Sequence, residues 1–348
     1  METCALAIPP RTGRRRLDPS RFCQCGTAVP ALRSLIHPMI TMPNNFLGLT
    51  PKYSNYKTAR FAVLPIPYDS TTSFQTGTRD GPAAIIRASQ QVELFDEELE
   101  REFYKTGVST LDPLLPNMAG PEAMHQEVLD AARKIVRDNK FLIGLGGEHS
   151  ITSGLVQAVM TKHKKLSILQ IDAHLDLRDE WEGTAHSHAC VMRRCLDLGA
   201  RIVSVGIRNI SMEEHRLIRT PSASAGPIRT APALKRSRQS PRIEVITARQ
   251  CLTDDNWVDR VLNALGDTVY VTIDIDGFDP SFAPGTGTPE PGGLDWYQVT
   301  GLLRLVAAEK KVVGADIVEV MPLPGQAVTE FLAARLAYKL ISYMQARA

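Results

Sequence analysis

Seven short apolar runs recur along this sequence, and they constrain its fold more than any other feature. The runs cover residues 60–66, 141–145, 166–171, 201–207, 243–246, 268–275 and 312–318. Each is almost continuously hydrophobic, which is typical of parallel strands covered on both faces. Helical periodicity is found between them, in segments 82–93, 121–139, 150–161, 187–198, 254–264, 295–308 and 328–345. The alternation predicts an α/β fold in which helices sandwich a mainly parallel sheet.

Two stretches differ from this pattern. Residues 1–50 contain an arginine cluster, scattered prolines and no periodicity, and we interpret them as a disordered leader or as a start assigned too early, with Met39 or Met42 as the true one. An organelle transit peptide is the alternative. Residues 220–242 are rich in Pro, Ser and Arg without Asp or Glu, which predicts a mobile surface insertion. The rest, 51–348, is predicted to be one catalytic domain.

Composition excludes several classes of partner. The net charge of +2 gives no reason to expect nucleic acid or an anionic membrane as partner. No apolar run is long enough to span a bilayer. The six cysteines form no CxxC pair and no disulfide-like framework. A reducing, cytoplasmic location is therefore expected.

Residues that can bind metals follow three of the apolar runs. Ligands of parallel α/β sheets sit beyond the carboxyl ends of the strands. The sequence there reads Gly-Gly-Glu-His-Ser at 146–150, Asp-Ala-His-Leu-Asp at 172–176 and Asp-Ile-Asp at 274–276. In the last two, ligand types recur at i and i+2, which places them on one face of an extended chain. The candidate ligands are His149, Asp172, His174, Asp176, Asp274 and Asp276.

A metal site explains these clusters better than structural roles do. A lone aspartate at a strand end is usually a helix cap, and a lone histidine is usually a hydrogen-bonded core residue. Four carboxylates packed together would repel one another unless cations neutralised them. Four aspartates and two histidines suit Mn²⁺ better than structural zinc or copper. Six ligands are too many for one ion with an open position, so we predict two Mn²⁺ per chain, about 3.5–4 Å apart, which lower the pKa of a shared water.

These motifs resemble those of a known family. GGEHS, DAHLD and DIDGFDP are similar to the three metal-binding signatures of the ureohydrolases, the arginase and agmatinase family, and all six ligand positions match. The resemblance extends from about residue 61 to the C-terminus, and segments 68–89 and 283–293 are more similar to agmatinases than to arginases. It implies an arginase-like three-layer αβα sandwich around an eight-stranded parallel sheet. It also implies a homo-oligomer, a trimer or hexamer.

The resemblance carries over further positions. His188 stands where the family has a histidine that shuttles protons to the leaving amine, Glu319 where a carboxylate grips the guanidinium, and Thr288 where a threonine lines the site. Ala189 is a departure, because the family often has glycine after the shuttle histidine, and a methyl group is costly there if φ is positive. His186 is a nearby competitor for the shuttle role.

Together these residues predict hydrolysis of a guanidino group to urea and an amine, with agmatine to putrescine as the leading reaction. Glu319 holds the guanidinium, Asp176 passes a proton to the leaving amine, and His188 completes the relay to solvent. Alternative substrates are arginine and 4-guanidinobutyrate, whose carboxylate would need a cation such as Arg178. Alternatives of other classes are a catalytically silent metal-binding homologue and a one-zinc deacetylase on a related fold.

Overall fold

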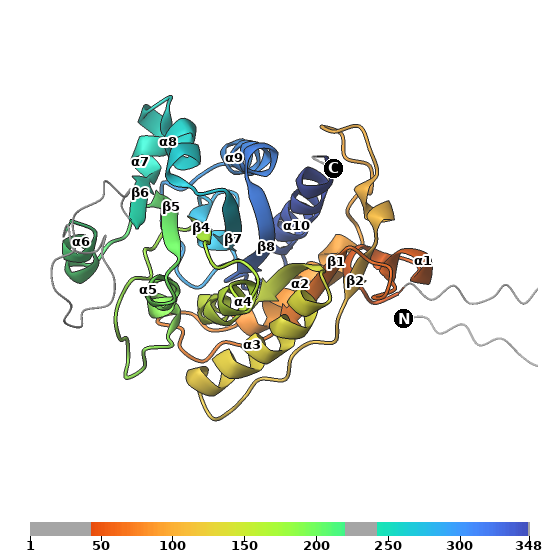
Figure 1. Cartoon of the computed structure of the whole chain (residues 1–348), viewed down its shortest axis with the longest axis horizontal. Helices are drawn as coiled ribbons and strands as arrows, with labels where there is room; N and C mark the ends of the chain where they lie inside the picture. The colour runs from red at the N-terminus through yellow and green to blue at the C-terminus, as the bar shows by residue number, and fades with distance from the viewer. Residues whose placement is uncertain (1–42, 220–241, 347–348) are drawn as a thin grey trace, which may run out of the picture. The chain divides into compact units, whose positions relative to one another are not determined.

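One parallel sheet organises the molecule. The computed structural model describes residues 43–219 and 242–346. The strands are β1 (Phe61–Ile66), β2 (Val108–Thr110), β3 (Phe141–Gly146), β4 (Ser167–Ile171), β5 (Arg201–Ile207), β6 (Ile243–Thr247), β7 (Thr268–Asp274) and β8 (Lys311–Val318). They lie in the order β2-β1-β3-β8-β7-β4-β5-β6, and all pairs are parallel (Figure 1). The predicted fold class, with an eight-stranded sheet, is confirmed.

Helices cover both faces of this sheet. Along β3, Leu142 packs into one apolar layer and its neighbour Ile143 into the other, because successive side chains of a strand point to opposite faces. The first layer is completed by α3 (Pro121–Arg137), α4 (Thr152–Val159) and α5 (Val191–Asp197). The second is completed by α2 (Gly81–Ser89), α8 (Trp257–Ala264), α9 (Trp296–Glu309) and α10 (Val328–Ala346). The outcome is the helix–sheet–helix sandwich that the apolar runs predict.

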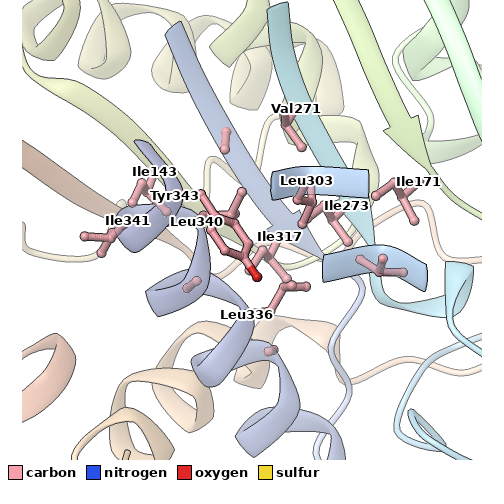
Figure 2. Packing of buried hydrophobic residues seen from close by; sticks show 14 of the residues in the cluster. Ile143, Ile171, Val271, Ile273, Leu303, Ile317, Leu336, Leu340, Ile341 and Tyr343 are labelled. Atoms are coloured by element: carbon pink, nitrogen blue, oxygen red, sulfur yellow. The ribbon is translucent and has the colours of Figure 1, made fainter. Parts of the chain in front are cut away.

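The C-terminal helix α10 is central to the second layer. Figure 2 shows Leu336 and Leu340 of α10 against Ile317 of β8, with Ile273 of β7 and Leu303 of α9 beside them. All five side chains are buried. Burying such a side chain contributes about 1.5–3 kcal/mol. The central strands are therefore clamped on this face and present their carboxyl ends in a fixed arrangement.

Several elements differ from the sequence-based expectation. The three-residue strand β2 and the helices α1 (Pro51–Ser54), α6 (Met212–Arg219) and α7 (Ala248–Thr253) are additional, and α2 ends at Ser89 rather than at residue 93. Residues 43–50 of the expected leader include the buried Phe46 and Leu47. The rest of that leader, and 220–241 of the expected insertion, lie outside the described residues. No helix in the described ranges combines the length and apolar character needed to cross a membrane.

A candidate metal centre at the carboxyl edge of the sheet

The candidate ligands follow three of the four central strands. Strands β3, β8, β7 and β4 are neighbours in the sheet. His149 follows β3 in a 3-10 turn (His149–Ile151), Asp172 follows β4 directly, and Asp274 ends β7. Gly147 makes the turn before His149 possible, because a Cβ there would lie 2.0 Å from the carbonyl oxygen of Tyr68. Since parallel strands end at one edge, ligands from distant parts of the sequence converge.

The first group of candidate ligands surrounds one ring nitrogen. His149 Nδ1 lies 3.2 Å from Asp172 Oδ2, 3.1 Å from Asp176 Oδ2 and 3.3 Å from Asp274 Oδ2. It is nevertheless a buried polar atom without a hydrogen-bond partner. Four donor atoms thus face one another with no hydrogen bond between them, which is the arrangement that a bound cation requires.

The other nitrogen of His149 explains why Nδ1 is free. Its Nε2 lies 2.9 Å from Thr272 Oγ1, and Thr272 Oγ1 donates at 2.6 Å to Asp316 Oδ1. A hydroxyl has one hydrogen, so Thr272 accepts from Nε2–H. The neutral ring then carries its proton on Nε2 and presents the Nδ1 lone pair to the three carboxylates. A carboxylate-backed partner of this kind commonly orients a metal-binding histidine.

The second group shares Asp172 with the first. His174 Nδ1 lies 3.0 Å from Asp276 Oδ2 and 3.7 Å from Asp172 Oδ1. Ligand atoms of Asp172, His174 and Asp276 lie within 4.8 Å of one another, as do those of His149, Asp172 and Asp274. Gln170 holds the shared carboxylate by donating to Asp172 Oδ2 at 2.8 Å. The donor set therefore fits two adjacent cations with one shared carboxylate.

Bound cations would also stabilise the charged carboxylates of the site. Burial raises the pKa of Asp274 well above its usual range, and the charges of Asp276 and Asp172 raise it further. Burial and the Asp172 charge raise the pKa of Asp176 to about 7. Burial lowers the pKa of His149, but the surrounding carboxylates outweigh it and raise that pKa well above the ordinary value. Without other cations the cluster would collect protons, and divalent ions would replace them.

Two residues of the site have a strained backbone. Asp176 has φ of 54° and Glu319 has φ of 62°. Left-handed conformations of non-glycine residues cost about 1–3 kcal/mol and cluster at functional sites. The conformation of Glu319 is held by its N–H, which donates at 2.8 Å to the Gly147 carbonyl. Its Oε1 accepts from the His149 N–H at 2.6 Å, so the carboxylate stands beside the first group.

A cavity of about 220 Å³ opens over both groups. Glu319 lines it and is only 8% exposed. Burial and the charge of Glu148 raise the pKa of Glu319 well above its usual range. A bound cation would lower the pKa of Glu319 again, and the charged carboxylate would in turn stabilise the bound cation. Thr288 also lines the cavity, with its hydroxyl 3.5 Å from Asp276 Oδ2.

His188 forms part of the cavity wall. It begins a short 3-10 turn (His188–Cys190), and Ser187 caps that turn through the Ala189 N–H. Burial lowers the pKa of His188 to about 4, and repulsion by His149 and His174 adds to the effect. The ring is therefore neutral near pH 7. Ala189 is absent from the positive-φ residues of the described chain, so its methyl group carries no backbone strain.

Of three further residues near the site, His186, Cys190 and Arg178, only Arg178 lines the cavity. His186 packs against His125 with ring centroids 5.1 Å apart, and it is not a lining residue. Cys190 is buried, and burial raises the pKa of its thiol to about 11, which is unsuited to a nucleophile. Arg178 does line the cavity, with its guanidinium 4.2 Å from the ring centre of Trp181.

Part of the cavity wall comes from segments that carry no metal-ligand pattern in the sequence. Ser73 and Phe74 come from the loop after β1, and Asn209, Ser211 and Glu214 come from the segment after β5. Both strands were predicted, so applying the carboxyl-end rule to them would have indicated these segments. Their residues are mostly hydroxyl, amide and aromatic side chains rather than clustered Asp and His, so no local pattern distinguishes them from an ordinary loop.

Comparison with known proteins agrees with this geometry. A model of the arginase family matches residues 59–342. An N(1)-aminopropylagmatine ureohydrolase from Synechocystis sp. is 40% identical over 309 residues, which cover 86% of this chain and 94% of that protein. An agmatinase of Pyrococcus horikoshii is 33% identical, covering 84% of this chain and 94% of its own. The crystal structure of agmatine ureohydrolase from Thermoplasma volcanium has a TM-score of 0.74 at 29% identity, covering 88% of this chain and 96% of the other. The chain described here belongs to the arginase family, the ureohydrolases.

Proposed function

We propose that this protein binds two Mn²⁺ ions and hydrolyses the guanidino group of agmatine to urea and putrescine. The observation that carries the proposal is His149 Nδ1, a buried atom without a hydrogen-bond partner that faces three carboxylate oxygens. Its Nε2 is committed to Thr272, so a cation among these atoms is the simplest way to satisfy them. The oxygen-rich donor set favours Mn²⁺. When bound, the ions supply Lewis-acid activation of water.

The residues of the chain have separate roles in this reaction. Glu319 stands beside the metal ligands with one oxygen held by His149, and it pairs with the planar guanidinium. Asp176 lines the cavity with its carboxylate 3.1 Å from His149 Nδ1, where it can accept a proton and release it. It passes that proton to the nitrogen of the departing amine. The departing amine takes up a second proton to leave as an ammonium ion, and His188 exchanges this proton between the cavity and solvent.

The substrate proposal has two specific competitors. The Synechocystis relative is named for N(1)-aminopropylagmatine, which favours an agmatine extended by an aminopropyl group as the second candidate. A guanidino acid is the third, because Arg178 lines the cavity and no carboxylate of the described residues pairs with it. The trimeric or hexameric assembly implied by the family resemblance is part of the same proposal.

A substrate panel tests the proposal. Purified protein is loaded with Mn²⁺, and urea release is measured from agmatine, N(1)-aminopropylagmatine, arginine and 4-guanidinobutyrate. We expect the highest kcat/KM with agmatine. A higher value with the aminopropyl compound or with the guanidino acid would reassign the substrate. Absence of urea from all four, with two Mn²⁺ bound, would indicate the catalytically silent homologue.

Metal analysis of the same preparation distinguishes the proposed two-manganese chemistry from the one-zinc chemistry of a deacetylase on a related fold. We expect two Mn²⁺ per chain by mass spectrometry of the digested protein. One Zn²⁺ per chain, together with deacetylase activity, would contradict the ureohydrolase mechanism.

A further inference from the structure

The ring of His188 lies between two hydroxyl groups of the loop that follows β1. Its Nδ1 lies 3.2 Å from Thr71 Oγ1, and its Nε2 lies 3.2 Å from Ser73 Oγ. The backbone N–H of His188 also donates to Thr71 Oγ1, at 3.0 Å. Which nitrogen carries the proton depends on the direction of these hydrogen bonds. That direction follows from the partners of the two hydroxyls.

The hydrogen of the Thr71 hydroxyl is committed to Glu148. Thr71 Oγ1 donates to Glu148 Oε1 at 2.8 Å, and Ser150 Oγ donates to the same oxygen at 2.5 Å. The backbone N–H groups of Ser70 and Thr71 both donate to Glu148 Oε2 at 2.6 Å. Glu148 is fully buried and accepts four hydrogen bonds, so it holds each of these donors in one orientation.

Thr71 Oγ1 can therefore only accept from His188. A hydroxyl has one hydrogen and two lone pairs, and here the lone pairs receive the backbone N–H and the ring Nδ1–H. Ser187 Oγ lies farther from Nδ1, at 3.3 Å, and its hydroxyl can turn either way, as acceptor of Nδ1–H or as donor, so the fixed hydroxyl of Thr71 at 3.2 Å sets the direction. An unprotonated Nδ1 would face the lone pair of Thr71. The contacts thus assign the proton of the neutral ring to Nδ1.

The outer side of the ring has the opposite polarity. Trp181 Nε1–H donates to Ser73 Oγ at 3.0 Å. With that lone pair occupied, the Ser73 hydroxyl is free to donate its hydrogen to the lone pair on His188 Nε2. Ser73 is exposed and lines the cavity, as do His188 and Trp181. Nε2 is therefore the nitrogen that faces both the reaction space and a hydroxyl in contact with solvent.

We propose that Glu148 and Thr71 are positioning residues that hold neutral His188 as the Nδ1–H tautomer, so that Nε2 is its proton-exchanging atom. The role in turnover rests on the proposed function. Nε2 takes up a proton that arrives from solvent by way of Ser73, and the ring becomes an imidazolium. The same nitrogen then gives that proton to the amine that has already received one proton from Asp176, the product leaves as an ammonium ion, and the neutral tautomer is restored. The bond from Nδ1–H to Thr71 persists throughout, so only the Ser73 hydroxyl must reorient.

The tautomer can be read directly by NMR. The probe is protein labelled with [¹⁵N]histidine and loaded with diamagnetic Zn²⁺ in place of paramagnetic Mn²⁺. His188 is assigned by comparison with the His188→Gln variant. We expect its Nδ1 to show the ¹⁵N shift of a protonated nitrogen and Nε2 that of an unprotonated one. The reverse pattern in the wild-type protein would overturn the inference.

Glu148→Gln gives a sharper test, because it reverses one donor. If the amide oxygen keeps the Ser70 and Thr71 N–H bonds, the amide NH₂ points at Thr71 Oγ1 and donates to it. The Thr71 hydroxyl is then free to donate to Nδ1. We expect the His188 tautomer to switch toward Nε2–H in this variant. Ser187→Ala is the matched control and should leave the wild-type tautomer in place, since Ser187 does not determine it.

Turnover gives the second readout. Thr71→Val removes the hydroxyl, and we expect kcat to fall about 10- to 100-fold with little change in KM, as for other residues that orient a functional histidine. Thr71→Ser restores the hydroxyl and should restore most of kcat. Equal loss in Val and Ser variants, or an unchanged tautomer in Glu148→Gln, would contradict the positioning role. If the tautomer switches as expected but no substrate releases urea, the proposed function fails while the control of the tautomer stands.

Discussion

At the scale of single residues, the cavity combines backbone strain with buried charge. Asp176 and Glu319 are the two lining residues with positive φ that are not glycine, and both are carboxylates. A relaxed backbone at either position would point the side chain elsewhere. The strain, about 1–3 kcal/mol each, is a stability cost that the surrounding sheet must offset. This pattern is typical of residues placed for binding or catalysis.

Glu319→Gln tests the role of the buried carboxylate. The amide keeps an oxygen that can accept from the His149 N–H but loses the charge that pairs with a guanidinium. A hydrogen bond to a charged group contributes about 1.5–3 kcal/mol, so we expect kcat/KM for urea release to fall roughly 10- to 100-fold. Glu213→Gln, at an exposed position of α6, is the matched control and should behave as wild type. Similar rates for Glu319→Gln and wild type would exclude Glu319 from guanidinium binding.

Metal stoichiometry tests the two ligand groups separately. His174 belongs to one group, whereas Asp172 belongs to both. We expect His174→Ala to reduce bound Mn²⁺ from two ions to one per chain. Asp172→Asn should weaken both ions. Mass spectrometry after equilibrium dialysis measures the stoichiometry, and equal losses in the two variants would contradict a shared ligand.

The metal-ligand candidates could be proposed from sequence for a physical reason. Asp172, His174 and Asp176 lie together at the end of one strand, so local spacing reveals their convergence. Glu148 and Thr71 are different, because 77 positions separate them and their contact exists only in the fold. Glu148 is visible in the Gly-Gly-Glu-His motif, but nothing local indicates that it anchors the loop after β1.

At the scale of elements, long periodic segments were predictable and short ones were not. The six residues of β1 form an apolar run, whereas β2 has only the three residues Val108–Thr110 and gains its pairing from β1. The helix α7 carries a capping box between Thr247 and Gln250, a signal in the sequence that was available. The helix α6 has only eight residues, and its apolar side is limited to the half-buried Leu217 and Ile218 packed on the first layer, which is too short a pattern to indicate a helix in the sequence.

The helix α10 contributes a buried ion pair that can be tested by stability. Lys339 is 2% exposed, and its Nζ lies 2.9 Å from Oδ1 of the fully buried Asp96. Replacing Lys339 by Met leaves the Asp96 charge without its cation, and removal of one partner of a buried pair costs about 3–5 kcal/mol. We expect a loss of that size in urea-induced unfolding at pH 7. Asp96→Asn in the same chain should recover part of it.

The same pair predicts a pH dependence. Burial alone would raise the pKa of Asp96, but hydrogen bonds from Lys339 and the Leu99 N–H lower it below the ordinary 3.8. The folded state therefore binds the Asp96 proton less tightly than the unfolded state does. The stabilisation is present above pH 3.8 and is lost as the pH falls through the lowered pKa. The stability difference between wild type and Lys339→Met should narrow in acid, and a constant difference would exclude Asp96 as the partner.

At the scale of the whole molecule, the site lies where the sheet brings distant segments together. Its charged groups follow β3, β4, β7 and β8, and these four strands are adjacent although the helices α4 to α9 lie between them in the sequence (Figure 1). Each strand is anchored by the two apolar layers on its faces. The repulsion among the carboxylates at the edge therefore opposes the packing of the centre. Folding and metal binding should be thermodynamically linked.

This linkage predicts that divalent ions stabilise the entire domain. A ligand that binds only the folded state at 100 times its Kd adds about 2.7 kcal/mol to the free energy of unfolding. We expect saturating Mn²⁺ to raise Tm by several degrees, and a chelator to return it to the metal-free value. The effect should be almost absent in Asp172→Asn, which lacks the shared ligand, and intermediate in His174→Ala. A Tm that responds to Mn²⁺ equally in all three proteins would show that the ions bind elsewhere.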